Sequence, residues 1–400
     1  MSPDHQKTGL FLVGVRGAIA TTVIHGLEAL HTGVPPLGMV TEAPVFSGHP
    51  FVPLSRLRIR GWDVAGDLHR SAEELSRMGV LPRDLVELCA DLRDRIELST
   101  CSGIAEPEDA QLIDPRARER LMLQPLEAVE ALREDIRSWI GEEGFRRAVV
   151  VYLATPERSR EIPQEWNDPA AEPLELLGEA PQDLSRSLLY ATAAIAEGLP
   201  FLNFTSAPGA AVPAVAGFAA RKGVPVLGND GKTGETLVKS VLAPLFRDRR
   251  LKVMSWEGTN MLGNRDGAAL EDAARRKSKL ANKDQVVPSI IGDPAAHVQS
   301  HIHFVPSLHD WKTAWDFIHF EGWLGTRMSL QFTWQGSDSA LAAPLVVDLA
   351  RLALLALERG LGGPLVAAAP FFKNPLGTEE HDFHRQMDGL RRWLDAGRTG

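Results

Sequence analysis

Basic side chains crowd into one stretch of this chain, from Met261 to Lys283. The stretch opens with Gly263-Asn264-Arg265-Asp266-Gly267, residue types that favour a sharp turn, and it continues from Ala268 with strong helix formers. On a helix, Lys279 and Lys283 would share one face, where two ammonium groups repel each other unless an anion sits between them. The stretch therefore indicates either a solvated basic face or a site for a small anion.

Composition narrows the choice of ligand. The chain has 400 residues and a net charge of -9, and this acidity argues against a general nucleic-acid binder, so local lysines favour a small anion. Cys89 and Cys101 are its two cysteines, which excludes a disulfide framework or a multi-cysteine zinc site and fits the reducing cytoplasm. The most apolar stretch, Leu345 to Leu357, contains Asp348 and Arg351, so we expect no membrane span.

A strand, a glycine turn and a helix open the chain and predict a dinucleotide-binding unit. The apolar run Leu10 to Val13 leads into Gly14-Val15-Arg16-Gly17-Ala18-Ile19-Ala20 and then into a helical pattern through Leu30. Gly14 permits the tight turn, Gly17 lets the backbone approach a pyrophosphate, and the small Ala20 lets the helix pack on the strand. The spacing G-x-x-G-x-x-A departs from G-x-G-x-x-G, so a plain strand-to-helix turn is the alternative.

Further strands and helices alternate after this unit. Gly38 to Thr41 is predicted as the second strand, and it is followed by Glu42, where an acid that binds the adenosine ribose is expected; a surface glutamate is the alternative. Ala148 to Leu153 has the continuous apolar pattern of a buried parallel strand. It ends at Ala154-Thr155-Pro156-Glu157-Arg158, and ligands sit at such carboxyl ends. Asn167 to Pro181 is acidic and is expected to form a surface loop.

The loop from Gly228 to Thr236 follows a short predicted strand and contains glycines, a lysine and a threonine. The full G-x-x-x-x-G-K-[ST] spacing is missing, so we reject a nucleotide triphosphatase. Asp230 and Lys232 remain candidates for a polar pair at a strand end.

The pattern changes after Pro288. His297 to Leu308 and Met328 to Trp334 alternate with the period of half-buried strands. We therefore predict an α/β fold: a doubly wound, mostly parallel (Rossmann-like) sheet from residues 1–237 and 338–400, with an inserted second α+β domain at residues 238–337. A helix from Asp338 to Leu361 would return the chain to the first domain, and Lys373 would follow on a short loop.

Four histidines in the second domain suggest a metal site at first sight: His297, His301, His303 and His309. His301 and His303 share one face of a predicted strand, but no helical H-x-x-x-H pair or carboxylate partner has the diagnostic spacing. Ordinary strand histidines are the favoured interpretation.

Several of these motifs, in this order, resemble the myo-inositol-phosphate synthase (inositol-3-phosphate synthase) family, from about Gly9 to Leu394. The specific ones are Leu262-Gly263-Asn264, Asp266-Gly267, Ser278-Lys279, Lys283, Gly228-Asn229-Asp230-Gly231-Lys232-Thr233-Gly234, Asp338-Ser339 and Leu341-Ala342-Ala343-Pro344. Gly38 to Thr41, Gly61-Trp62-Asp63-Val64 and Glu157-Arg158 match with lower specificity. Agreement of several motifs in sequence is stronger evidence than any one alone.

The resemblance implies an NAD-dependent isomerase that converts D-glucose 6-phosphate into 1D-myo-inositol 3-phosphate. In the family's reaction the C5 hydroxyl is oxidised by NAD, a proton leaves C6, the enolate closes on the C1 aldehyde, and the retained NADH reduces the ring ketone. The phosphate and the enolate are both anions, so lysines in a water-poor pocket suit this chemistry.

The resemblance also assigns roles to residues. Lys279 would accept the proton of the C5 hydroxyl with Asp230 as its charge partner, Lys373 would face the C5 oxygen, Lys283 and Lys312 would bind phosphate, and Asp310 and Asp338 would orient lysines and sugar hydroxyls. Asn264 and Asp266 join the substrate-binding set. The expected cofactor-binding residues are Gly14, Val15, Arg16, Gly17, Ala18, Thr41, Asp63, Ala154, Thr155, Asn203, Ser206, Asp230 and Asp338.

The chain departs from the family pattern at a few positions. The glycine loop lacks the usual Gly-Gly-Asn-Asn character, Arg265 replaces an asparagine, and His303 replaces a lysine, which points to a weaker phosphate grip or an altered substrate. The family also implies a homotetramer built through the inserted domain, and a monovalent or divalent cation is left open. Two alternatives stay in play: an NAD-linked dehydrogenase acting on a phosphorylated sugar or amino-acid precursor, and a non-catalytic dinucleotide sensor.

Overall fold

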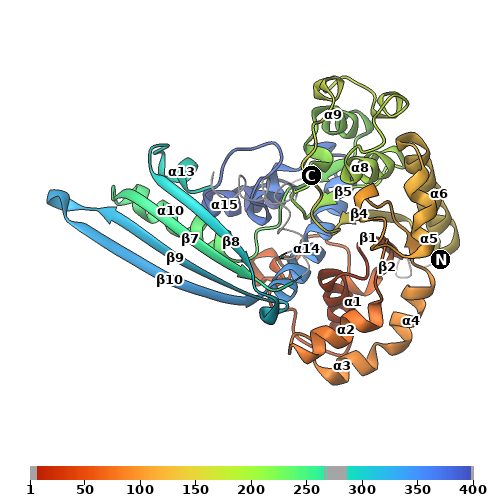
Figure 1. Ribbon diagram of the computed structural model, residues 1–400, viewed down its shortest axis with the longest axis horizontal. Coiled ribbons are helices and arrows are strands. Elements are labelled where there is room, and N and C mark those ends of the chain that lie inside the picture. The colour runs from red at the N-terminus through yellow and green to blue at the C-terminus, as the bar shows by residue number, and fades with distance from the viewer. Residues whose placement is uncertain (1–6, 265–266, 268–285, 398–400) are drawn as a thin grey trace.

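A computed structural model describes residues 7–264, 267 and 286–397 of the chain. A seven-stranded sheet with the order β11-β6-β5-β4-β1-β2-β3 forms its first domain, and every neighbouring pair in it is parallel. The strands are β1 (Thr8–Val13), β2 (Leu57–Asp63), β3 (Cys101–Ser102), β4 (Arg147–Tyr152), β5 (Phe201–Asn203), β6 (Pro225–Leu227) and β11 (Gly363–Pro364). The predicted fold class is therefore confirmed, and helices cover both faces of the sheet (Figure 1).

Alternation along β1 explains the two layers of helices. Leu10 and Leu12 face a core shared with α1 (Ala18–His31) and α14 (Asp338–Glu358). Phe11 and Val13 face the opposite core, which includes α6 (Pro125–Glu143), α8 (Arg186–Ala196) and α9 (Pro213–Lys222). Because side chains alternate across a strand, one apolar strand serves both layers. The other α-helices of the described residues are α2 (Leu68–Arg77), α3 (Arg83–Leu88), α4 (Ala90–Leu98), α5 (Pro115–Arg118), α7 (Pro173–Leu176), α10 (Glu235–Asp248), α13 (Val286–Ile291) and α15 (Phe383–Ala396).

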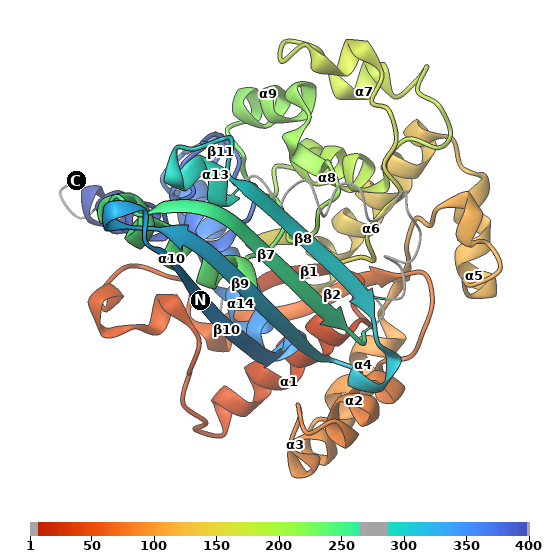
Figure 2. The same ribbon diagram turned by 60° about the vertical axis from the view of Figure 1, so that its left-hand side comes forward.

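A second, four-stranded sheet projects from one side of the doubly wound domain (Figure 1). Its order is β10-β9-β7-β8, with β7 and β8 parallel and the other pairs antiparallel; Figure 2 shows the four strands side by side. Apolar residues of α10, α13, β7 and β9 form a small core of their own. The strands are β7 (Lys252–Leu262), β8 (His297–Phe304), β9 (Trp311–Glu321) and β10 (Arg327–Ser337).

One predicted strand is wrong. Residues Val40–Glu42 form a single 3-10 turn, and β2 occupies the position beside β1 instead. The carboxylate of Asp348, on α14, accepts the backbone N–H groups of Val40 and Thr41 at 2.6 and 2.9 Å. These bonds hold the segment on α14, so it cannot join the sheet.

One other prediction needed adjustment, and two strands were missed. The expected loop at Asn167–Pro181 contains the short helix α7, and strands β7 and β9 were not predicted. The domain boundaries at 237/238 and 337/338 stay predictions. By length and composition α14 could cross a membrane, as the one such helix among the described residues, but 72% of its most apolar window is buried within the fold.

Candidate active site

The turn between β1 and α1 forms the first binding element. Gly14 has φ +87°, and a Cβ there would lie 3.2 Å from the Leu153 carbonyl oxygen, so both backbone conformation and space favour glycine. Gly17 precedes the first residue of α1, Ala18, and both line a cavity in front of the helix. The N-terminus of a helix carries partial positive charge and free N–H groups, which suit a pyrophosphate.

Asp63, at the end of β2, lies beside this turn. Its carboxylate accepts the backbone N–H of Arg16 at 2.7 Å and that of Val64 at 2.8 Å. Burial raises the pKa of Asp63, although these N–H bonds oppose the shift. Glu42, which was expected to be the ribose acid, instead pairs with Arg351 at 2.6 Å. That expectation was wrong because it followed from the misplaced second strand, and Asp63 holds the position at the strand end.

A cavity of about 710 Å³ lies at this edge of the sheet, within the size range of ligand pockets. It brings together predicted residues that are far apart in the sequence: Gly14, Gly17, Ala18, Asp63, Ala154, Thr155, Asn264, Asp310 and Asp338.

A smaller cavity of about 70 Å³ adjoins the first. The residues common to both linings are Ile19, Leu153, Ala154, Pro156 and Asp338. The smaller cavity adds predicted polar residues from four different loops and strands: Ser206, Asp230, Lys312 and Lys373. A cofactor in the large cavity would therefore lie next to a polar molecule in the small one.

Lys373 and Asp230 form the central ion pair of the smaller cavity. The Lys373 ammonium donates to Asp230 Oδ1 at 2.6 Å, and the two side chains are only 7% and 5% exposed. The backbone aligns them, because the Lys373 N–H donates to the Asp230 carbonyl at 2.7 Å and the Lys232 N–H donates to the Phe371 carbonyl at 2.8 Å. This pairing differs from the expected one between Asp230 and Lys232.

Lys232 is buried beside this pair and has a neutral partner. Its ammonium donates to the Gln386 side-chain oxygen on α15 at 2.7 Å. Burial lowers the pKa of Lys232 to about 7, with Asp382 opposing the shift and Lys373 reinforcing it. Lys373 and Lys232 thus differ in what compensates their charge.

Asp338 is the first residue of α14 and faces both cavities. Its carboxylate accepts from the Asn264 side-chain amide at 3.3 Å and from the Thr233 hydroxyl at 3.4 Å. A carboxylate held by two neutral donors can orient a hydroxyl of a bound sugar.

Asp310 has partners of its own at the start of α14. It accepts from the hydroxyls of Ser337 and Ser339 at 2.5 and 2.8 Å. Burial raises the pKa of Asp310, although these bonds oppose the shift. Asp310 therefore fixes the turn before α14, and Lys312, two residues later and 9% exposed, lines the smaller cavity.

The remaining predicted site residues lie elsewhere. Of those the structure describes, Val15, Arg16, Thr41 and Asn203 line neither cavity. Thr41 bonds to Asp348 and the Asn203 amide to the Ala207 carbonyl, so their side chains have structural partners. Asp266, Lys279 and Lys283 lie outside the described residues.

Sequence reasoning missed several polar residues around the site. Thr205 and Thr233 line the smaller cavity, and Glu106 and Asp109 line the larger one. The adjacent turn residues Asp230 and Lys232 gave a signal for Thr233, whereas Glu106 and Asp109 lie in a segment without a recognisable motif.

The histidines of β8 contact one carboxylate. Glu257 lies 2.7 Å from His297 and 3.5 Å from His301. Among the described residues, no group of three His, Cys, Asp or Glu side chains has an arrangement that could hold a metal ion.

The chain has clear relatives among known proteins. The family model described as "Myo-inositol-1-phosphate synthase" matches residues 234–339. The inositol-3-phosphate synthase 1 of Bacteroides thetaiotaomicron is 32% identical over 412 residues, which cover 97% of this chain and 93% of the relative. This chain belongs to the inositol-3-phosphate synthase family. The inositol-3-phosphate synthase of Trypanosoma brucei brucei is 30% identical, over 86% of this chain and 71% of its own length.

Solved structures agree with this family membership. The inositol-3-phosphate synthase of Caenorhabditis elegans has a TM-score of 0.86 and 25% identity, covering 98% of this chain and 86% of that one. A myo-inositol-1-phosphate synthase-related protein of Thermotoga maritima has a TM-score of 0.79 and 23% identity, covering 98% and 99%, and it supports the fold alone.

Proposed function

We propose that this protein is an isomerase that converts D-glucose 6-phosphate into 1D-myo-inositol 3-phosphate. A relative that is named for this activity aligns with 97% of this chain. The observation that carries the proposal is the buried Lys373–Asp230 pair, which faces a small polar cavity joined to a dinucleotide-sized one. A reaction that needs a hydride acceptor and an acid–base lysine on the same sugar suits this arrangement.

NAD is the cofactor that we propose for the large cavity. The glycine turn and the first residue of α1 line the large cavity, where a pyrophosphate would bind, and Asp63 lies at the strand end where a carboxylate binds ribose hydroxyls. When bound, NAD would supply a hydride acceptor for C5 and return the same hydride to that carbon. An assisting cation stays an open part of the proposal.

Lys373 would act on the C5 oxygen. As that oxygen passes from hydroxyl to ketone and then to enolate, its negative charge grows and is stabilised by an ammonium held in a water-poor site. Asp230 keeps Lys373 oriented through the 2.6 Å bond. Lys312 would bind the phosphate, and Asp338 would orient a sugar hydroxyl.

Two lysines outside the described residues complete the proposed site. By the family resemblance, Lys279 accepts the C5 hydroxyl proton and Lys283 binds phosphate together with Lys312. Since the smaller cavity already contains Lys312 and Lys373, the added lysines would complement the charge of a phosphomonoester.

The reaction is redox-neutral overall, and that property gives its test. Purified protein would be incubated with D-glucose 6-phosphate and a small amount of NAD, with inositol phosphate and NADH both followed. We expect many moles of inositol 3-phosphate per mole of NAD and no steady rise in NADH. NADH that accumulates in step with product would favour the NAD-linked dehydrogenase, and no product at all would refute the proposal.

We further propose a cytoplasmic homotetramer assembled through the second sheet. Apolar side chains are exposed on its strands, among them Trp315 at 40%, Met328 at 39% and Leu330 at 37%. Exposed apolar surface of this kind favours association. Light scattering at several protein concentrations tests it: we expect the mass of four chains, and Trp315→Glu should reduce that mass. A monomer throughout would contradict the assembly.

A further inference from the structure

Residues 103–114, which we call the lid segment, form a compact loop over the large cavity. The Gly103 N–H donates to the Asp63 carbonyl at 2.9 Å, and the Asp114 N–H donates to the Val64 carbonyl at 2.8 Å. Both ends of the loop are thus fastened at the end of β2, as in an Ω-loop. Between those ends, the segment lines the cavity with Ile104, Ala105, Glu106, Asp109, Leu112 and Ile113.

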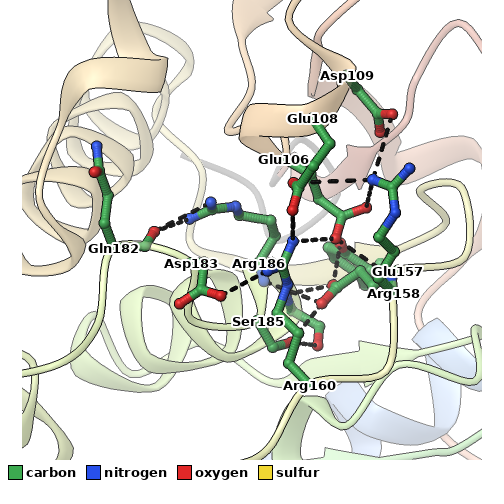
Figure 3. Close-up of polar contacts among 12 residues, drawn as sticks. Glu106, Glu108, Asp109, Glu157, Arg158, Arg160, Gln182, Asp183, Ser185 and Arg186 are labelled. Atoms are coloured by element: carbon green, nitrogen blue, oxygen red, sulfur yellow. Dashed lines mark hydrogen bonds and ion pairs between the residues drawn. The ribbon is translucent and has the colours of Figure 1, made fainter. Parts of the chain in front are cut away.

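The middle of the lid segment is acidic, and arginines from the loop after β4 hold it. Arg160 Nη2 lies 2.9 Å from both carboxylate oxygens of Glu108 and 3.2 Å from Glu106 (Figure 3). Arg158 also faces the acidic segment, with its Nη1 3.8 Å from Asp109. Arg160 donates directly to two carboxylates of the lid segment, those of Glu106 and Glu108.

Arg160 also binds a residue outside the lid segment. Its Nη1 donates to Asp183 at 2.7 Å, and its side chain is 16% exposed. Burial acts to lower the pKa of the Arg160 guanidinium, but the bonds to Glu108 and Glu106 outweigh this and raise it. The guanidinium thus bridges the lid segment and the body of the domain.

The bridge matters because the proposed cofactor, NAD, is anionic. Several acidic residues line the large cavity, among them Asp63, Glu74, Glu106, Asp109 and Glu157. Acidic side chains that face a pyrophosphate repel it unless cations compensate them. Release of Arg160 would loosen the acidic middle of the lid segment, which the cofactor would then repel.

A redox-neutral reaction needs its reduced cofactor to stay in place until the last step. We propose that residues 103–114 are a lid over the cofactor and that Arg160 is the positioning residue that keeps it closed, so that NADH is retained through each turnover. This inference rests on the proposed function, yet cofactor release can be measured without any substrate.

The first experiment measures NADH release. Protein loaded with NADH is mixed with excess NAD in a stopped-flow instrument, and the decay of NADH fluorescence gives the release rate. We expect Arg160→Gln to release NADH about tenfold faster, because most affinity changes appear in the dissociation rate. Arg133→Gln is the matched control: Arg133 has 18% side-chain exposure and bonds to Glu197 at 2.7 Å, and it lines neither cavity among the described residues.

A second variant, Glu108→Gln, distinguishes two explanations. Either the Arg160–Glu108 bond acts as a latch that holds the lid closed, or the charge of Arg160 acts on the cofactor at long range. Glu108 is 43% exposed and bonds to Arg160, but it is absent from the described lining of the cavity. If Arg160 acts as a latch, Glu108→Gln also speeds release, and the double variant is no faster than Arg160→Gln alone. If Arg160 only adds positive potential, removing the negative charge of Glu108 slows release.

The outcomes are distinct. Faster release in both single variants, with an unchanged Arg133→Gln, supports the lid; an Arg160→Gln rate equal to wild type, or slower release in Glu108→Gln, overturns it. During turnover Arg160→Gln should also leak NADH, which then accumulates with an equal amount of unreduced keto sugar phosphate, beside the inositol phosphate from completed turnovers. A wild-type protein that binds no NADH would refute the proposed cofactor as well, so the two failures can be told apart.

Discussion

Two buried lysine–carboxylate groups in this protein look alike but lie in different surroundings. Lys373 pairs with Asp230 at 2.6 Å. Lys239, on α10, lies 2.7 Å from Glu235 and 3.4 Å from Asp316, with all three side chains at most 1% exposed. The Lys373 pair lines the smaller cavity, whereas none of the three residues Lys239, Glu235 and Asp316 lines either described cavity.

Packing accounts for the difference. A Cβ at Gly258 would lie 2.5 Å from Glu235 and 2.7 Å from the Lys239 ammonium, so the second group has no room for a ligand. Trp256 donates to Asp316 at 2.8 Å and helps to fix that group inside the second domain. Burial of a charged pair therefore does not mark a site by itself, and an adjoining cavity is needed.

Lys373→Met gives the largest expected effect. Removing the cation that we propose faces the reacting oxygen should lower kcat by about 10³-fold. Steady-state kinetics measure the rate and a thermal melt checks the fold. Lys222→Met, at an exposed lysine that lines neither described cavity, is the control. A Lys373→Met enzyme with near wild-type kcat would contradict the catalytic role of the Lys373–Asp230 pair.

Lys239→Met should act on stability instead. Breaking a buried ion pair leaves an uncompensated charge and costs about 3–5 kcal/mol, and here two carboxylates lose their shared cation. Urea denaturation measures the free energy of unfolding, and kcat per folded molecule should stay near that of wild type. If kcat falls as in Lys373→Met while stability is unchanged, the two groups have been assigned the wrong way round.

Lys232→Met should change how the stability of the protein depends on pH. Burial lowers the pKa of Lys232 from 10.5 to about 7. Between these values the unfolded chain binds more protons than the folded one, so stability rises with pH from about 7 to 10. We expect the variant to lose part of this rise, as measured by urea denaturation across that range. An unchanged slope would mean that Lys232 stays charged in the fold.

Asp316→Asn should give the smallest effect. It concerns a fall in stability with rising pH, whereas Lys232 contributes a rise. Burial raises the pKa of Asp316 from 3.8 to about 6, partly offset by Lys239. The folded state then binds more protons than the unfolded one, so stability falls as pH rises from about 4 to 6. The variant should show a shallower fall. Asp348, whose pKa burial raises to about 6, contributes to the remainder together with Asp63 and Asp310. An equally steep fall would exclude Asp316 as its source.

Local patterns made much of the fold predictable. The apolar run, glycine turn and helix at the start of the chain act within about twenty residues, and β1 and α1 form there as expected. Gly38 to Thr41 looks equally suited to a strand, but its backbone N–H groups are taken by Asp348, which is 308 residues from Val40. No local pattern could reveal that bond.

The same limit applies to the site. Motifs placed Asp230, Lys312, Asp338 and Lys373 at the cavities. The partner of Asp230 depended on how two loops pair, and Gly231 forms a bridge with Phe372 that sequence spacing does not encode. Arg160 and Glu106 are 54 residues apart, and each alone reads as an ordinary surface charge.

The fate of the C5 hydrogen tests the central claim most directly. The protein would convert D-glucose 6-phosphate deuterated at C5, with catalytic NAD present, and the product would be analysed by mass spectrometry and NMR. We predict that inositol 3-phosphate keeps the deuterium at the same carbon, because the hydride leaves and returns within one closed cavity. Loss of the deuterium to free reduced cofactor or to solvent would contradict the account.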